Sequence, residues 1–125
     1  MINRVRVITS SKTYDKLDIV AKALYILIKD NKGGTTYITR GKLARAIYME
    51  LGVSEKLRKI SSLAQGILEA LVDVGQVKIF RKSARGTIYV IDSSSSIWKL
   101  IKECRESEVK CIEKLKNFLA KVIET

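Results

Sequence analysis

The sequence predicts a mainly α-helical α+β fold, with three helices, one short strand and a β-hairpin, followed by one long C-terminal helix. Two observations lead to this fold class. Apolar residues recur at helical spacing in four stretches, and three short segments have the β-branched content or the alternation typical of strands. The chain has 125 residues, 46% of them hydrophobic, which suits one folded domain with an appendage.

The first helix is expected to begin near Thr13, and residues 31–34 end it with two glycines. Acidic residues lie in its first turns and Lys29 in its last, as the helix dipole favours. Residues 1–12 precede it as either an edge strand or a loose arm carrying Arg4 and Arg6.

A short strand is expected at 35–38, where the residues are β-branched or aromatic. Thr39 can then cap a second helix over 39–51. A third helical segment covers 54–74, either as one helix starting at Ser54 or as a turn followed by a helix. A glycine follows each of these two segments and is expected to end it.

Two alternating strands are expected at 76–81 and 87–91, joined by a basic tip over 82–86 in which Gly86 permits a positive φ. The serine run 93–96 marks the start of the last segment. Nothing in residues 94–124 breaks a helix, because the chain contains no proline and this stretch contains no glycine.

This order of elements, over residues 13–91, resembles the winged helix-turn-helix family. The residues that carry the resemblance are the second helix, Ile38–Ile47, and the third, Ile60–Gly75, followed by the strand, basic tip and strand. The connection over 53–59 is longer than the usual tight turn, so the start of the recognition helix stays open. The resemblance implies that the third helix enters the major groove of double-stranded DNA while the hairpin, the wing, lies on the backbone.

The charge points to a polyanionic partner independently of this resemblance. The chain has 24 Lys and Arg against 13 Asp and Glu, a net charge of +11. Residues 1–91 carry 17 basic and 7 acidic side chains, and residues 92–125 carry 7 and 6. Binding to a polyanion is therefore expected of the first part, with nucleic acid ahead of an anionic membrane surface. The alternative is a solvated, lysine-rich surface.

Three groups of side chains are candidates for DNA contact. The face of the third helix opposite its apolar stripe carries donors and acceptors near its N-terminus, and the hairpin tip has three basic residues without an acid. The second helix begins with basic residues, which interact unfavourably with the helix dipole, and a bound phosphate would offset this interaction. Alternatively, Ser61, Ser62 and Gly66 serve only capping and close packing. The candidates are Arg40, Lys42, Arg45, Arg58, Lys59, Ser61, Ser62, Gln65, Arg81, Lys82 and Arg85.

The C-terminal segment predicts a coiled-coil helix through which two chains form a homodimer. Its apolar residues follow spacings of four and three, interrupted only by Glu108, and about 31 residues make a helix roughly 46 Å long. The alternative is a terminal helix that folds back on its own domain. The predicted dimer interface comprises Ile97, Ile101, Cys104, Cys111, Leu115, Phe118 and Val122.

Cys104 and Cys111 lie one heptad apart, so both are expected in this seam as ordinary core residues. An interchain disulfide is the other possibility. In an antiparallel pair Cys104 would approach the partner's Cys111, whereas in a parallel pair like residues would meet.

In size, charge and layout the chain resembles small crenarchaeal chromatin and transcription proteins that have a winged helix and a C-terminal dimerising helix. We therefore expect a homodimer that binds double-stranded DNA as a transcriptional regulator. The alternatives are a chromatin or plasmid-partition protein that coats DNA, and a winged-helix adaptor that binds proteins.

The composition argues against catalysis and against cofactors. The absence of histidine removes the commonest general base and ligand, and two cysteines cannot form a four-thiolate zinc site. We expect no metal, cofactor, small-molecule substrate or membrane partner. The first ten residues lack the features of a signal peptide, so a cytoplasmic, nucleoid-associated protein is expected.

Overall fold

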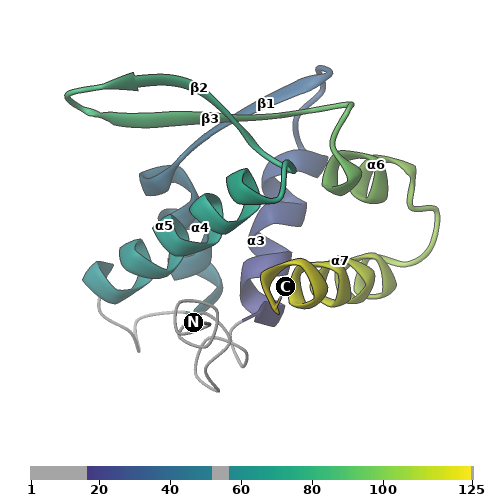
Figure 1. Cartoon of the computed structure of the whole chain (residues 1–125). Coiled ribbons are helices and arrows are strands. Elements are labelled where there is room, and N and C mark those ends of the chain that lie inside the picture. The colour runs from purple at the N-terminus through teal and green to yellow at the C-terminus, as the bar shows by residue number, and fades with distance from the viewer. Residues whose placement is uncertain (1–16, 52–56, 125) are drawn as a thin grey trace.

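The computed structural model describes residues 17–51 and 57–124, in which helices and a small antiparallel sheet form a mixed α+β fold (Figure 1). This agrees with the predicted mainly α-helical class. The predicted arm over 1–12 and the predicted cap at Ser54 lie outside the described residues. The elements are α3 (Leu17–Lys29), β1 (Thr35–Thr39), α4 (Arg40–Leu51), α5 (Leu57–Asp73), β2 (Lys78–Ser83), β3 (Gly86–Asp92), α6 (Ser96–Glu103) and α7 (Glu108–Glu124).

Helix α3 is the centre of the helical part, because α4, α6 and α7 all contact it. Its apolar residues occupy several faces rather than one stripe, and Val20, Leu24 and Ile28 are fully buried. A single cluster of buried side chains runs from α3 through the other helices and the sheet. The chain from 92 onward therefore shares a core with the residues before it.

The ends of the middle helices follow local chemistry. Thr39 caps α4, since its Oγ1 accepts a hydrogen bond from the Lys42 N–H at 3.1 Å. Helix α5 ends in a Schellman turn, in which Gly75 has φ +78° and the Gln76 N–H donates to the Leu71 carbonyl at 2.9 Å. Both features match the predicted cap and stop.

The three strands form one sheet in the order β1-β3-β2, with both pairs antiparallel. Ile38 and Tyr89 are paired and buried, so this face of the sheet is the inner one, against the helices. On the opposite face Tyr37 pairs with Val90, and no helix formed by residues 17–51 or 57–124 lies on that side of the sheet (Figure 1). The hairpin thus projects with one face toward α5 and the other uncovered.

Gln76 joins the root of the hairpin to the start of α6. Its side-chain oxygen accepts hydrogen bonds from the Ser95 hydroxyl at 3.1 Å and from the Ile97 N–H at 3.2 Å. Just before this point, two hydrogen bonds from Ser94 hold the pKa of the Asp92 carboxyl below its usual range. The turn between β3 and α6 is therefore tied to both elements.

The predicted single C-terminal helix is wrong for this structure. Helix α6 ends at Glu103 and α7 begins at Glu108, with residues 104–107 outside both helices. Cys104 and Cys111 form an intrachain disulfide, and their Cα atoms are 6.0 Å apart. Seven residues of straight helix would separate those atoms by about 10.5 Å. The disulfide and a continuous helix are therefore mutually exclusive.

The predicted dimer interface is not found on a free helix in this structure. Four of its residues are buried within the chain itself, because α6 and α7 fold back against α3, as in the alternative considered from the sequence. An interchain disulfide is likewise replaced by the intrachain one. Ile97, Ile101, Cys111 and Leu115 are fully buried, while Cys104, Phe118 and Val122 are half-buried.

Candidate nucleic-acid interface

Helix α5 has a buried face and an outer stripe with opposite properties. Its buried residues include Ile60, Ile67 and Leu71, which fix the orientation of the helix on the core. Residues at helical spacing on the other side define what we call the outer stripe of α5. From the N-terminal end these residues are Lys59, Ser62, Gly66, Glu69 and Asp73.

The N-terminal half of α5 presents most of the predicted residues to solvent. Arg58, Lys59 and Ser62 are exposed, whereas Ser61 is half-buried. Arg58 and Lys59 both lie within the helix, although the length of the preceding connection left its start open. Two cations and one hydroxyl are therefore available for a ligand that approaches this end.

Gln65 differs from the prediction that it is available to read bases. It is half-buried, and its Nε2 donates to the Glu69 carboxylate at 2.6 Å and to the Tyr89 hydroxyl at 3.2 Å. The bond to Glu69 lies within α5, and the bond to Tyr89 links α5 to β3 across the space between the helix and the hairpin. Gln65 therefore has a positioning role in this structure, which its sequence position alone does not indicate.

The outer stripe of α5 becomes acidic toward its C-terminal end. Glu69 and Asp73 are exposed on it, four and seven residues after Gln65 and Gly66 respectively. Their carboxylates repel phosphate, so only the first half of the stripe is electrostatically suited to a polyanion. This change of sign was not predicted, although the same helical spacing that selects Lys59 and Ser62 also selects Glu69 and Asp73.

A β-bulge in the hairpin decides where its basic residues point. Ile79 pairs with Tyr89, but the register then shifts, so that Arg81 pairs with Ile88 and Lys82 with Thr87. Paired residues share a face of a sheet. Lys82 therefore lies on the inner face, toward α5, and Arg81 on the outer face. Without the bulge at Phe80 the two side chains would exchange faces.

The hairpin tip is a two-residue turn, Ala84–Arg85, between Ser83 and Gly86. Gly86 has φ +129°, and the Ser83 Oγ accepts from the Arg85 N–H at 3.2 Å. All three predicted basic residues of the tip region are exposed. The turn begins two residues later than the predicted tip because β2 extends to Ser83.

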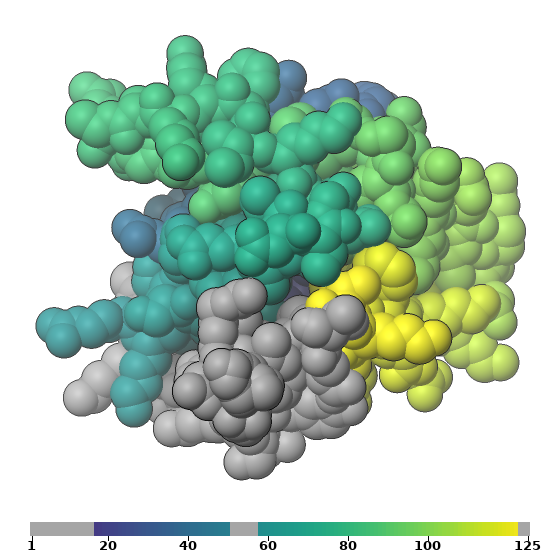
Figure 2. Space-filling view, viewed as in Figure 1, coloured from purple at the N-terminus to yellow at the C-terminus, as the bar shows by residue number. Residues whose placement is uncertain are grey.

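A groove of about 600 Å³ separates α5 from the inner face of the hairpin. Gln65, Glu69 and Asp73 line it from α5, and Tyr89 and Lys82 line it from the hairpin. In Figure 1 the hairpin runs over α5, and its tip points to the same side as the N-terminal end of the helix; Figure 2 shows the hairpin overhanging the helix. The basic half of α5 and the basic tip therefore border one side of the molecule.

The predicted residues of α4 form a separate group. Arg40, Lys42 and Arg45 are all exposed at the start of this helix. The Lys42 Nζ donates to the Tyr37 carbonyl oxygen at 3.3 Å, which directs that side chain toward β1. Arg40 and Arg45 have solvent-exposed side chains that can reach a bound polyanion.

Other kinds of site find no support among the described residues. Within 17–51 and 57–124, no three of Cys, Asp and Glu are grouped to hold a metal ion. Within the same ranges, no helix is both long enough and apolar enough to cross a membrane. No protein-family model, curated protein or solved structure matches the chain.

Proposed function

We propose that the protein is a winged helix-turn-helix module that binds double-stranded DNA, with the N-terminal half of α5 in the major groove and the β2–β3 hairpin as the wing. The observation that carries this proposal is the common orientation of the two basic features. Lys59 and Ser62 are exposed on the N-terminal half of α5, Lys82 lines the groove from the inner face of the hairpin, and the hairpin overhangs the helix (Figure 2).

The element order supports the same proposal. A helix, a strand, two helices and a hairpin, with the first strand paired to the second strand of the hairpin, is the arrangement in which a winged helix presents its recognition helix. Helix α5 has 17 residues, and its exposed half is narrow enough for the major groove.

The distribution of charge defines how the DNA would lie. Phosphates are favoured beside Arg58, Lys59 and the hairpin tip, and disfavoured beside Glu69 and Asp73. The duplex would therefore contact the N-terminal half of α5 and the hairpin tip, and it would not contact the root of the hairpin. Because the Gln65 amide is already occupied by Glu69 and Tyr89, Ser62 is the exposed polar residue that remains to read bases. We expect modest sequence specificity.

The test is a salt-dependent titration of a labelled duplex with the full chain and with Lys59→Ala and Lys82→Ala variants. Each phosphate contact that is lost should reduce the slope of log affinity against log salt by about 0.9. Lys110→Ala is the matched control, because Lys110 is an exposed lysine on α7. The control should keep both the affinity and the slope of the unmodified protein.

Three results discriminate among the possible functions. Absence of binding at low salt would refute the proposal. If every duplex binds with equal affinity, and Ser62→Ala does not change it, the protein is a DNA-coating chromatin or partition protein and not a transcriptional regulator. A preferred duplex whose advantage is lost in Ser62→Ala would support a regulator.

One observation favours the adaptor as a second candidate. Tyr37 and Phe80 are 47% and 54% exposed on the uncovered side of the sheet, and their rings make an edge-to-face contact with centroids 5.0 Å apart. Exposed aromatic pairs of this kind are common in protein interfaces. If the adaptor is correct, Arg81→Glu combined with Lys82→Glu leaves function in the cell intact, whereas Tyr37→Ala abolishes it.

A further inference from the structure

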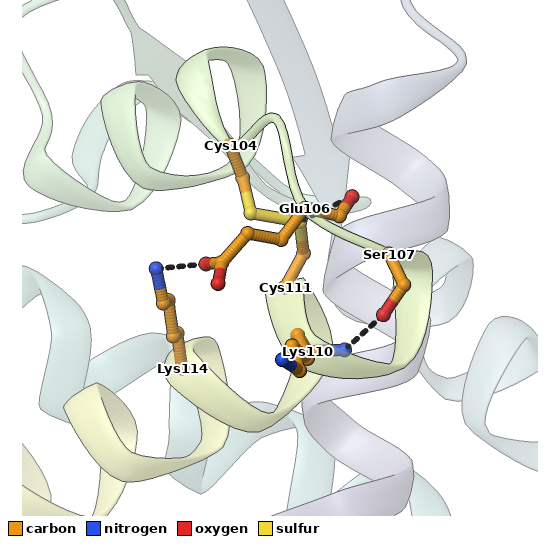
Figure 3. The surroundings of a disulfide bond; sticks show 6 residues. All are labelled: Cys104, Glu106, Ser107, Lys110, Cys111 and Lys114. Carbon is orange, nitrogen blue, oxygen red and sulfur yellow. Dashed lines mark hydrogen bonds and ion pairs between the residues drawn. A yellow bond between two sulfur atoms is a disulfide. The ribbon is translucent and has the colours of Figure 1, made fainter.

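The Cys104–Cys111 disulfide lies across the only connection between α6 and α7. We call residues 104–107 the hinge segment. The bond joins the end of α6 to the first turn of α7, as Figure 3 shows. With the bond intact the hinge segment must stay bent, because the two Cα atoms are 6.0 Å apart and a straight helix needs about 10.5 Å between them.

Nothing in the amino-acid sequence of the hinge segment requires a bend. It reads Cys-Arg-Glu-Ser, without glycine or proline, and the four-and-three spacing of the tail continues through it. The bent form has few contacts of its own. Lys114 pairs with Glu106, and the Ser107 Oγ accepts from the Lys110 N–H at 3.3 Å (Figure 3). All of these groups are exposed and can be solvated when the segment straightens.

The bent form is otherwise maintained by the contacts that α7 makes with α3 and, less extensively, with α6 and α5. Cys111, Leu115 and Leu119 are buried at 1% or less, and Lys116 pairs with Asp18 at 3.0 Å. The α3 surface and α7 lie far apart in the sequence, on either side of the hinge segment. An α7 that belongs to a second copy of the chain can therefore make the same contacts with α3 once the hinge segment is straight.

The disulfide is accessible to a reductant from one side. Cys111 is buried, but Cys104 is half-buried and lines a surface hollow of about 390 Å³ whose charged residues are Lys99, Glu103 and Lys114. Glu103 opposes the charge of Lys99 there and Lys114 is paired with Glu106, so the position of Cys104 at the hollow, rather than the local charge, gives a thiolate access to the bond. The sulfur of Cys104 is thus the point of attack.

We propose that Cys104–Cys111 is a thiol–disulfide exchange site at which a dithiol controls the exchange of α7 between two copies of this chain. A thiolate of the dithiol attacks the Cys104 sulfur, forming a mixed disulfide and releasing Cys111 as a thiolate. The second thiol of the reductant then displaces Cys104. The protein gains two electrons and two protons, and the dithiol is oxidised to its own disulfide.

Once reduced, the hinge segment joins α6 and α7 into one helix, and each α7 packs on the α3 of the other copy. The contacts of α7 are regained in this swapped dimer, and the hinge segment adds helical hydrogen bonds. The Glu106–Lys114 ion pair is lost, and so is the translational and rotational entropy of two separate chains. The exchange is therefore second-order in protein and favoured at high concentration. It also brings Cys104 of one copy beside Cys111 of the other.

The experiment measures the mass of the full chain by light scattering before and after treatment with dithiothreitol. We expect the 14.1 kDa of one chain when oxidised and twice that mass when reduced. Removing the reductant from the dimer in air should then give a covalent dimer on a non-reducing gel. A Cys104→Ser, Cys111→Ser double variant should be dimeric without any reductant.

A hinge variant provides the matched control. Arg105→Gly with Glu106→Gly removes the exposed Glu106–Lys114 ion pair, which contributes little to the bent form, and strongly disfavours the straight form because glycine is a poor helix former. This variant should remain monomeric after reduction. A wild-type chain that is reduced only in denaturant, or that stays monomeric once reduced, would overturn the proposal, and so would a dimer that the two glycines do not weaken.

None of these measurements involves DNA. The exchange of α7 can therefore be refuted while the proposed function holds, and the proposed function can be refuted while the exchange holds. One consequence does rest on the proposed function. A swapped dimer carries two binding modules, and reduction would therefore raise the affinity for DNA that offers two sites.

Discussion

The hydroxyl of Thr36 is buried without a partner. Thr36 is 1% exposed on β1, next to Ile91 of β3, and its Oγ1 is the one buried side-chain polar atom among the described residues that makes no hydrogen bond. A buried polar atom without a partner costs about 1–3 kcal/mol. This position therefore carries an uncompensated polar atom within the hydrophobic core.

Thr36→Val should raise the free energy of unfolding by about 1 kcal/mol, because valine keeps the shape of threonine and removes the unpaired hydroxyl. The measurement is urea unfolding of the oxidised chain. Thr36→Ser is the control, since it keeps the hydroxyl and loses a methyl group, and it should lower the same free energy. A valine variant less stable than the parent would show that the hydroxyl has a partner in solution.

At the scale of the element, α5 contains a glycine in a position that does not require one. A Cβ at Gly66 would meet no atom within 4 Å, and the residue lies in the middle of a 17-residue helix beside the groove. Glycine costs about 1 kcal/mol relative to alanine in such a position. The structure gives no stabilising reason for this residue, which is consistent with a role at the binding surface.

Gly66→Ala should therefore stabilise the protein by about 0.5–1 kcal/mol and weaken DNA binding, because the new methyl group occupies the surface expected to face the duplex. Thermal unfolding and duplex titration of the same sample check both parts. An increase in stability with unchanged affinity would move the proposed contact away from this turn of α5.

The sequence predicted most elements to within three residues, because their signals are local. The Thr39 cap, the Gly75 stop and the alternation of the hairpin depend on neighbours in the chain. The tail was different. Apolar spacing of four and three describes which face of a helix is buried but not what buries it, and here α3 of the same chain does so. The pairing of Cys104 with Cys111 depends on that tertiary packing.

The candidate site shows the same division. Exposure of Lys59, Ser62 and Arg85 follows from helix period and turn position, and it was predicted. The faces of Arg81 and Lys82 depend on a bulge at Phe80 that alternation does not reveal. The hydrogen bond from Gln65 to Glu69 joins neighbours on one helix, but the bond to Tyr89 requires β3 to lie beside α5, which no local pattern contains.

At the scale of the whole molecule, the disulfide stabilises the folded chain because it lowers the conformational entropy of the unfolded chain. It closes a loop across a sequence separation of 7 residues, for which the chain-entropy relation gives about 2.5 kcal/mol. The folded monomer should therefore lose about this much free energy of unfolding on reduction. The melting temperature should fall by roughly 10 °C.

Calorimetry at low protein concentration measures this loss without exchange of α7, and the double-glycine hinge variant extends the range of concentration that can be used. A reduced monomer as stable as the oxidised one would mean that the bent hinge segment persists in the unfolded chain. A much larger loss would mean that α7 leaves α3 altogether when the bond is broken.

The packing of α7 on α3 also has a consequence for biosynthesis. The Asp18–Lys116 ion pair and the burial of Leu115 join segments from opposite ends of the described chain. A ribosome that adds about 5–20 residues per second needs roughly 4–16 s to proceed from the end of α3 to the start of α7. During that interval the side of α3 that later receives α7 remains open to solvent. Nascent chains on one polysome therefore expose this apolar side of α3 close to one another. A chaperone that covers it would prevent their association.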